Sequence, residues 1–155
     1  MTGRDPRWVR VDEWTVAQTH GEEASPSEEV LARAFQHQEE SGLPDISVSL
    51  SQGQYIQIQA KVANARHILE VGTLGGYSTI FLASAGPETR VISVEAVPLH
   101  VRVARENLEM AGVSDRVEVI EGDALEILPA ILEDVRQGRR EKFNFVFIDA
   151  DKLNS

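Results

Sequence analysis

The feature that most constrains this 155-residue chain is a short apolar run that leads directly into a glycine-rich turn. Ile68, Leu69 and Val71 are typical of a buried strand, and glycines follow at positions 72, 75 and 76. Residues 77–83 then have the pattern of a helix start. Glycine lets the backbone pass close to a ligand, and the unpaired N–H groups of a helix start favour a negative ligand group. We therefore predict the first strand–turn–helix unit of a nucleotide-binding α/β fold.

Strand-like and helix-like segments alternate regularly after this unit. Further strands are expected at residues 90–95, 116–121 and 143–148, with helices at 98–110 and from 123 onward. Pro129 lies too deep for a first helical turn and predicts a kink or a restart of the last helix. Before the glycine turn, helices are expected to open around Ser25 and at Ser51. The alternation predicts a parallel sheet with right-handed crossovers and helices on both faces.

Composition and charge narrow the class of protein. The chain has 25 acidic against 15 basic residues, a net charge of -10, which argues against nucleic acid or an anionic membrane as a partner. It has no cysteine, and no apolar run approaches the roughly 20 residues of a membrane span. We expect a cytoplasmic protein with an N-terminal arm at residues 1–24 and one domain at 25–155.

The four histidines show no metal spacing and are interpreted as solvated. Arg136, Arg139 and Arg140 are interpreted as a solvated loop rather than a site for a coenzyme A phosphate.

The spacing of the glycines distinguishes between two kinds of nucleotide ligand. A dinucleotide fingerprint has glycines at relative positions one, three and six, whereas this turn has Gly72, Leu74 and Tyr77 there. Glu70 precedes the first glycine, and an acid at that place favours a ligand with ammonium and sulfonium groups over a pyrophosphate. Glu95 ends the next strand, where such folds bind ribose hydroxyls. The combination favours S-adenosylmethionine, and a nicotinamide oxidoreductase is the less favoured alternative.

Three segments of the chain resemble the cation-dependent O-methyltransferases, the group that includes the caffeoyl-CoA and catechol O-methyltransferases. These segments are Leu69–Ser78, Glu121–Ala124 and Phe147–Lys152, in the family's order. The resemblance runs from about Val48 to Asn154. It implies the Rossmann-like fold of S-adenosylmethionine-dependent methyltransferases, a homodimer, and a small catechol-like or phenolic hydroxyl acceptor.

The resemblance assigns the donor site residue by residue. Four positions would line the amino-acid end of the donor: Glu70, Gly72, Thr73 and Ser78. Glu95 would bind the ribose, and Asp123 and Ala124 would flank the adenine. Asp151 would contact the donor from the last strand, while Val48 stands where relatives often have a residue with a hydroxyl.

The resemblance also implies a metal ion and a general base. Asp149 matches the first metal-binding carboxylate of the family, and Lys152 matches its proposed general base. A hard divalent cation such as Mg²⁺ prefers oxygen ligands, and on two neighbouring hydroxyls it would stabilise the phenolate. The lysine would accept or steer the proton, and the acceptor oxygen would attack the sulfonium methyl in line.

The end of the sequence departs from the family pattern. Family members continue into further helices and strands, which carry the remaining metal ligands and much of the acceptor pocket. The expected fold is therefore incomplete, with C-terminal strands missing and the apolar strand at 143–148 left as an open edge. One hypothesis is a truncated methyltransferase that binds the donor weakly and catalyses little or nothing. The alternative is a non-catalytic interaction module that pairs through this edge.

Overall fold

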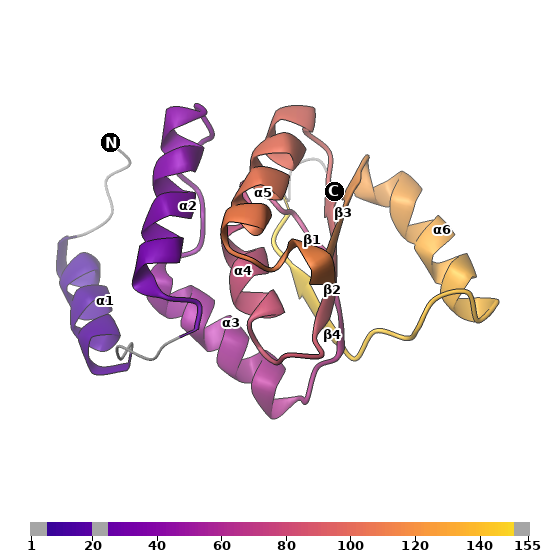
Figure 1. Ribbon diagram of the computed structural model, residues 1–155, viewed down its shortest axis with the longest axis horizontal. Coiled ribbons are helices and arrows are strands. Elements are labelled where there is room, and N and C mark those ends of the chain that lie inside the picture. The colour runs from indigo at the N-terminus through magenta and orange to yellow at the C-terminus, as the bar shows by residue number, and fades with distance from the viewer. Residues whose placement is uncertain (1–5, 20–24, 151–155) are drawn as a thin grey trace.

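A computed structural model describes residues 6–19 and 25–150 and shows a parallel sheet between two layers of helices (Figure 1). Helices α1 to α5 lie on one side of the sheet and α6 lies on the other. The predicted parallel sheet with helices on both faces is thereby confirmed. The elements are α1 (Pro6–Thr19), α2 (Glu28–Glu40), α3 (Leu50–Val62), β1 (His67–Val71), α4 (Tyr77–Ala83), β2 (Arg90–Glu95), α5 (Pro98–Met110), the short 3₁₀ helix η1 (Ser114–Arg116), β3 (Val117–Glu121), α6 (Ala124–Arg136) and β4 (Phe145–Ile148).

Local capping determines where several helices begin. Ser49 and Gln52 form a capping box at the start of α3, so this helix begins one residue before the predicted Ser51. Asp123 caps α6 as expected, with its side chain accepting a hydrogen bond from the backbone N–H of the second helical residue. The helix then continues unbroken through Pro129 to its end. The predicted restart at Pro129 is therefore wrong.

The order of the strands creates a reversal beside β1. The sheet order is β3-β2-β1-β4, so the chain moves outward through β2 and β3 and then returns to the other side of β1. All three pairings are parallel, so the carboxyl ends of the four strands meet at one edge of the sheet. In an open α/β sheet, the crevice at such a reversal is the usual ligand site.

The hydrophobic core lies between the sheet and the helices α2 to α5. Ile68 of β1, Val91 of β2 and Phe81 of α4 are fully buried in it. The opposite face is less covered, since Ile131 is the one residue of α6 that is buried. Burial of the first face therefore supplies most of the apolar stabilisation in the described part of the chain.

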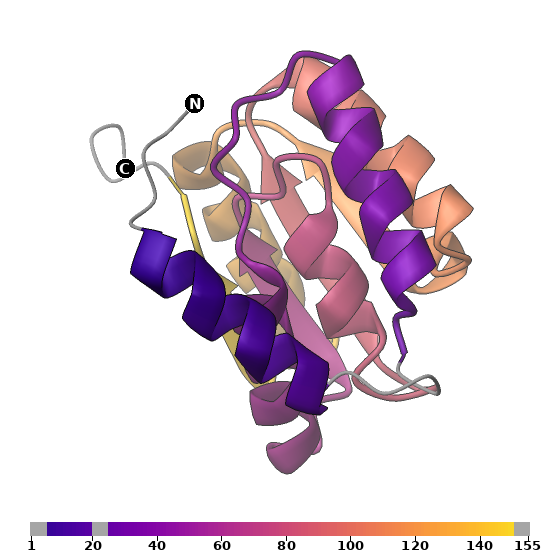
Figure 2. The ribbon, with the colours of Figure 1, turned by 90° about the vertical axis from the view of Figure 1, so that its left-hand side faces the viewer.

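The outermost layer is α1, which packs against α3 (Figure 2). Asp12 of α1 accepts hydrogen bonds from the hydroxyls of Ser49 and Ser51 at the start of α3. This helix lies in the predicted N-terminal arm and spans 14 residues. Across residues 6–19 and 25–150, no helix combines the length and apolarity that crossing a membrane requires.

Candidate functional site

A cavity of about 420 Å³ lies at the carboxyl ends of the strands. Its wall includes the turn after β1, the end of β2 and the first residues after β4, together with residues 46–48 and the turn into α6. Tyr77 forms part of the apolar wall, and its ring packs edge-on against Phe35 and Phe81 with centroid distances of 6.3 and 5.7 Å. Burial raises the pKa of Tyr77 to about 12. The cavity thus occupies the crevice at the topological reversal.

The glycine turn is held between β2 and β4 by main-chain hydrogen bonds. The N–H of Gly72 donates to the carbonyl of Val94 at 2.9 Å, and the N–H of Asp149 donates to the carbonyl of Val71 at 2.9 Å. Gly72 has a φ of 96°, and a Cβ added there would lie 2.4 Å from the carbonyl oxygen of Asp149. Only glycine fits this position, both for its conformation and for the close approach of the neighbouring strand. Leu74, with a φ of 50°, also adopts the left-handed region that side chains disfavour.

Glu95 fastens the turn to the end of β2. One of its carboxylate oxygens, Oε2, accepts from the N–H groups of Thr73 at 3.2 Å and Leu74 at 2.8 Å. The other, Oε1, accepts from the N–H of Val97 at 2.9 Å and lies 3.4 Å from Nδ1 of His100. The carboxylate lies on the cavity wall, where the predicted ribose ligand would meet it. That ribose contact stays a prediction.

Glu70 lies beneath the turn rather than on the cavity wall. Its side chain is fully buried, and the residues that line the cavity do not include it. Oε1 accepts from the hydroxyl of Ser78 at 2.6 Å, while Oε2 accepts from the hydroxyls of Ser93 and Thr79. Burial raises the pKa of Glu70 above its ordinary value, these three hydroxyls oppose the rise, and the charge of Asp149 adds a smaller upward contribution. The direct contact between Glu70 and the donor stays a prediction, and of the three hydroxyl donors only Ser78 belongs to a residue that lines the cavity.

The remaining predicted residues divide into three groups. Gly72, Thr73, Ser78, Val48, Ala124 and Asp149 line the same cavity, together with Glu95. Asp123 is used as the cap of α6 and is not part of the wall. Asp151 and Lys152 lie outside the described residues.

The residues around Asp149 provide few ligands for a metal ion. Asp149 is exposed at the rim of the cavity. Across residues 6–19 and 25–150, no three His, Asp or Glu side chains come together as a metal site would require. Mg²⁺ is usually held by one or two carboxylates and keeps several waters in its octahedral shell, so Asp149 could supply one ligand, and the described residues form no fuller cluster around it.

His100 belongs to the site, although the sequence analysis interpreted all four histidines as solvated. Its side chain is 17% exposed, and it lines the cavity beside Glu95. The solvated interpretation is also wrong for His37, whose Nδ1 lies 2.7 Å from the side-chain oxygen of Asn107. The signal that identifies His100 is its place in the first turn of the helix after β2, five residues beyond Glu95. Helices that follow parallel strands begin at the carboxyl edge of the sheet, where ligands bind.

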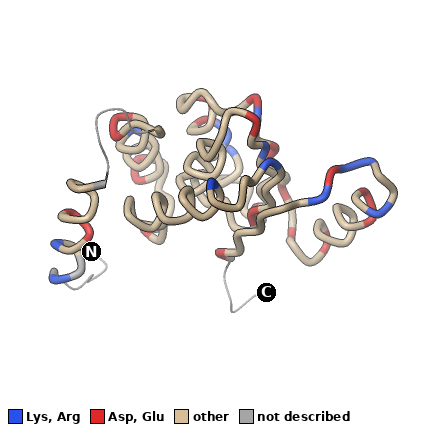
Figure 3. The backbone as a smooth tube through the Cα atoms, turned by 90° about the horizontal axis from the view of Figure 1, so that it is seen from below, with Lys and Arg blue, Asp and Glu red and all other residues tan. Residues whose placement is uncertain are grey.

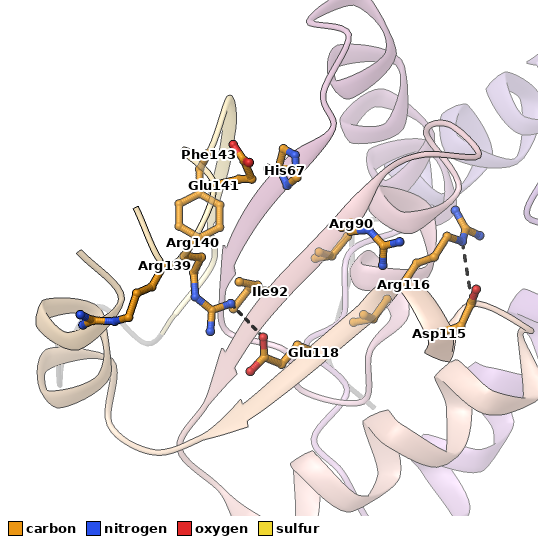
Figure 4. A pocket seen from close by; sticks show the side chains of 12 residues that line it. His67, Arg90, Ile92, Asp115, Arg116, Glu118, Arg139, Arg140, Glu141 and Phe143 are labelled. Atoms are coloured by element: carbon orange, nitrogen blue, oxygen red, sulfur yellow. Dashed lines mark hydrogen bonds and ion pairs between the residues drawn. The ribbon is translucent and has the colours of Figure 1, made fainter. Parts of the chain in front are cut away.

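A second cavity, of about 350 Å³, lies at the opposite end of the sheet, where the strands begin (Figure 4). Its wall contains four arginines: Arg90, Arg116, Arg139 and Arg140. Three of these four arginines already have protein partners. Arg140 contacts Glu118 at 2.9 Å, Arg139 contacts Asp134 at 2.6 Å, and Arg116 donates to two main-chain carbonyls. None of the predicted site residues within the described ranges lies here, so we place the functional site at the carboxyl ends.

The fold and the cavity together define a Rossmann-like protein with a glycine turn at the crevice where such folds usually bind ligands. A family model described as O-methyltransferase matches residues 20–155 of the chain. The chain therefore belongs to the O-methyltransferase family. This confirms the resemblance found in the sequence, and the nicotinamide oxidoreductase alternative gains no support.

Individual relatives are similar over most of this chain. It is 48% identical to a catechol O-methyltransferase of Mycobacterium tuberculosis over 126 residues. This matched stretch makes up 81% of this chain and 54% of the relative. It is 38% identical over 151 residues to an O-methyltransferase of Aspergillus flavus, covering 97% of this chain and 61% of the relative. The crystal structure of an O-methyltransferase from Bacillus cereus in complex with S-adenosylhomocysteine has a TM-score of 0.82 and 39% identity, covering 96% of this chain and 64% of that one. The chain thus spans between 54 and 64% of the length of these proteins.

Proposed function

We propose that this chain forms the donor-binding part of an S-adenosylmethionine-dependent O-methyltransferase that acts on a small catechol-like or phenolic hydroxyl. The observation that carries the proposal is the cavity at the carboxyl edge, where the glycine turn, Glu95 and Ser78 meet. The Bacillus cereus neighbour, a complex with S-adenosylhomocysteine, supports the choice of donor. The Mycobacterium tuberculosis relative, named as a catechol O-methyltransferase, supports the class of acceptor.

The residues of the cavity have separate tasks in this proposal. Gly72 and Thr73 lie against the amino-acid end of the donor, because the turn offers backbone there and no side chain at position 72. Glu95 accepts the ribose hydroxyls, and its anchoring to the N–H groups of the turn keeps it at the cavity wall. Ala124, at the start of α6, lies beside the adenine. When bound, the donor supplies an electrophilic sulfonium methyl, and the chain contributes by holding it in position for in-line attack.

The metal and the general base remain predictions that rest on the resemblance. In the proposal, Asp149 supplies one oxygen ligand to a divalent cation such as Mg²⁺, and Lys152 handles the proton of the acceptor. The described residues do not form the remaining part of a metal site. We therefore derive no chemical step through a metal ion.

The proposal is tested with purified chain, donor labelled on its methyl group, catechol and Mg²⁺. We expect donor binding, which should be lost in Gly72→Val because its side chain would meet the carbonyl of Asp149, and little or no labelled methylcatechol. Robust formation of labelled methylcatechol would contradict the truncation hypothesis. Absence of donor binding at millimolar concentration would remove the proposal itself.

A second function, pairing with another chain, has one observation in its favour. Among the described strands β4 pairs with β1 alone, and its Val146 and Ile148 are 52 and 71% exposed. Open apolar strand edges tend to pair. Size-exclusion chromatography over a range of concentrations, with Val146→Lys as the disrupting variant, distinguishes a homodimer from a monomer. From the composition of the sequence, which has no cysteine and no apolar run of membrane-spanning length, we also propose a cytoplasmic location, which cell fractionation would check.

A further inference from the structure

The back of the glycine turn is held by Asn107, a fully buried side chain of α5. Its amide nitrogen Nδ2 donates to the carbonyl of Gly75 at 2.8 Å and to the carbonyl of Ala34, in α2, at 3.3 Å. These two hydrogen bonds use both protons of the amide nitrogen. The side chain of Asn107 therefore ties the turn to α2 and to α5.

The oxygen of the same amide is bonded to His37 of α2. With Nδ2 donating, Oδ1 of Asn107 can only accept, so Nδ1 of His37, which lies 2.7 Å away, must carry a proton. On the other side of the ring, Nε2 lies 3.3 Å from the carboxylate of Glu106, whose side chain is 46% exposed. A charged imidazole and a neutral one protonated at Nδ1 both keep the bond to Asn107. Only the contact with Glu106 requires the charge.

The backbone around Gly75 needs this support. Leu74 before it has a φ of 50°, and Gly76 after it has a φ of 82°. A side chain in the left-handed region is strained, and such a conformation persists only where the surrounding structure holds it. Leu74 is held in front by the bond from its N–H to Glu95, at 2.8 Å. It is held behind by the bond from Asn107 to the next carbonyl along the chain.

The front of the turn is the part that forms the cavity wall. Thr73 and Leu74 line the cavity, whereas the asparagine and the histidine behind the turn do not. The N–H groups of Thr73 and Leu74 share one carboxylate oxygen of Glu95, which is also on the wall. If the carbonyl of Gly75 loses its anchor, Leu74 can relax toward an ordinary conformation. Its N–H then leaves Glu95, so the wall changes shape without the loss of any side chain from it.

We propose that Asn107 and His37 are positioning residues for the methyl donor, which act through the carbonyl of Gly75 and touch no ligand. This inference rests on the proposed donor site. A structural role would also explain a buried, fully bonded asparagine. It would not make the affinity for a ligand follow the presence of one N–H group at position 37 in variants that all remain folded.

The experiment is a calorimetric titration with S-adenosylhomocysteine on variants shown to be folded by circular dichroism. His37→Leu removes the proton donor and leaves Oδ1 of Asn107 unpaired, so affinity should fall about threefold to tenfold, the equivalent of one hydrogen bond. His37→Asn restores an N–H group, since its amide nitrogen is bonded to Cγ as Nδ1 of histidine is. Its affinity should stay within about twofold of the unaltered chain. Asn107→Leu should lose at least about tenfold, because the carbonyl of Gly75 then has no donor.

Two control variants separate this effect from charge and from general loss of stability. Glu106→Gln removes the charged contact with His37 and keeps the bond at Nδ1. Leu108→Ala opens a cavity in the core beside Asn107 and removes none of these hydrogen bonds. Both should bind S-adenosylhomocysteine within about twofold of the unaltered chain.

The backbone amide signals of the ligand-free chain give a second readout. The signals of Leu74 and Gly76 should move in His37→Leu and stay in place in His37→Asn and Glu106→Gln. Unchanged affinity in His37→Leu, an equal loss in Leu108→Ala, or no recovery in His37→Asn would overturn the inference. The pair of variants at position 37 decides the matter even if Asn107→Leu does not fold. If the unaltered chain binds no S-adenosylhomocysteine, the proposed function fails first and this inference with it.

Discussion

The two ends of the sheet use polar side chains in opposite ways. At the carboxyl end, Glu70 and Glu95 are buried and receive hydrogen bonds from hydroxyls and main-chain N–H groups. At the amino end, charged residues pair on the surface, as Arg140 does with Glu118, whose side chain is 55% exposed. The basic residues gather especially in the segment after α6 (Figure 3). At this end the arginines are used mainly to pair with acidic side chains and main-chain carbonyls of the protein itself.

The energetic reason for the difference is desolvation. A buried carboxylate is costly unless donors satisfy it, so Glu70 and Glu95 constrain the groups around them. Surface ion pairs gain little, because water and salt screen them. Substitutions at the carboxyl end should therefore cost more than chemically similar ones at the amino end.

The largest effect, a fall in the free energy of unfolding, is expected for Gly72→Ala. The added Cβ would clash with the carbonyl of Asp149 in a conformation that alanine disfavours, at an expected cost of about 3–5 kcal/mol. Urea unfolding measures this loss. The matched variant is Gly138→Ala, beyond the end of α6, where φ is 69° and an added Cβ would meet no described atom within 4 Å. It should cost only about 1–2 kcal/mol. Equal losses would contradict the clash at position 72.

The second-largest effect, a loss of affinity for S-adenosylhomocysteine, is expected for Glu95→Gln. The neutral side chain weakens the bonds to the N–H groups of Thr73 and Leu74, so affinity for S-adenosylhomocysteine should fall about tenfold or more. The same change at the other end, Glu118→Gln, should leave that affinity within about twofold. Calorimetry on both variants compares the two ends directly. A larger loss for Glu118→Gln would reverse the comparison.

A dependence on pH is expected from the burial of Glu70. Its folded pKa is raised above the ordinary value of 4.5, so the folded state holds this proton more tightly than the unfolded chain. The stability that this proton contributes is complete below pH 4.5 and is lost as the pH rises through the folded pKa. Relative to Glu70→Gln, the free energy of unfolding should fall over that interval and then level off. A rise over the same interval in a urea series would show a lowered pKa instead.

The smallest effect is expected for Arg140→Ala. Its ion pair with Glu118 lies near the surface, and pairs of this kind contribute about 0–1 kcal/mol. The free energy of unfolding should change within that range, and binding of S-adenosylhomocysteine should be unaffected. Loss of ligand binding would indicate that the amino-end cavity takes part in the function.

Much of the fold was predictable because its signals are local. The apolar run of β1, the glycines after it and the cap at Asp123 each depend on a few neighbouring residues. The start of α3 was misplaced because Ser49 and Ser51 are both capping residues, and only the bond to Gln52 decides between them. The restart expected at Pro129 does not occur, because the helix continues on both sides of this residue.

The site was predictable only in part because it depends on strand register. Thr73 and Ser78 line the cavity because they belong to the turn and to the helix start, and their contact with the donor stays a prediction. Nothing local places Ser93 opposite Glu70, so the hydroxyl network was missed. His100 was missed for a similar reason, because its role depends on where α5 begins relative to the end of β2.

The central claim, that the carboxyl-edge cavity holds the methyl donor, is tested most directly by titrating isotope-labelled chain with S-adenosylhomocysteine and following its backbone amide signals by NMR. The account predicts saturable shifts at Gly72, Leu74 and Val97, with the signals of Arg139 and Arg140 unmoved. Shifts that cluster at the arginines, or none at millimolar ligand, would contradict it.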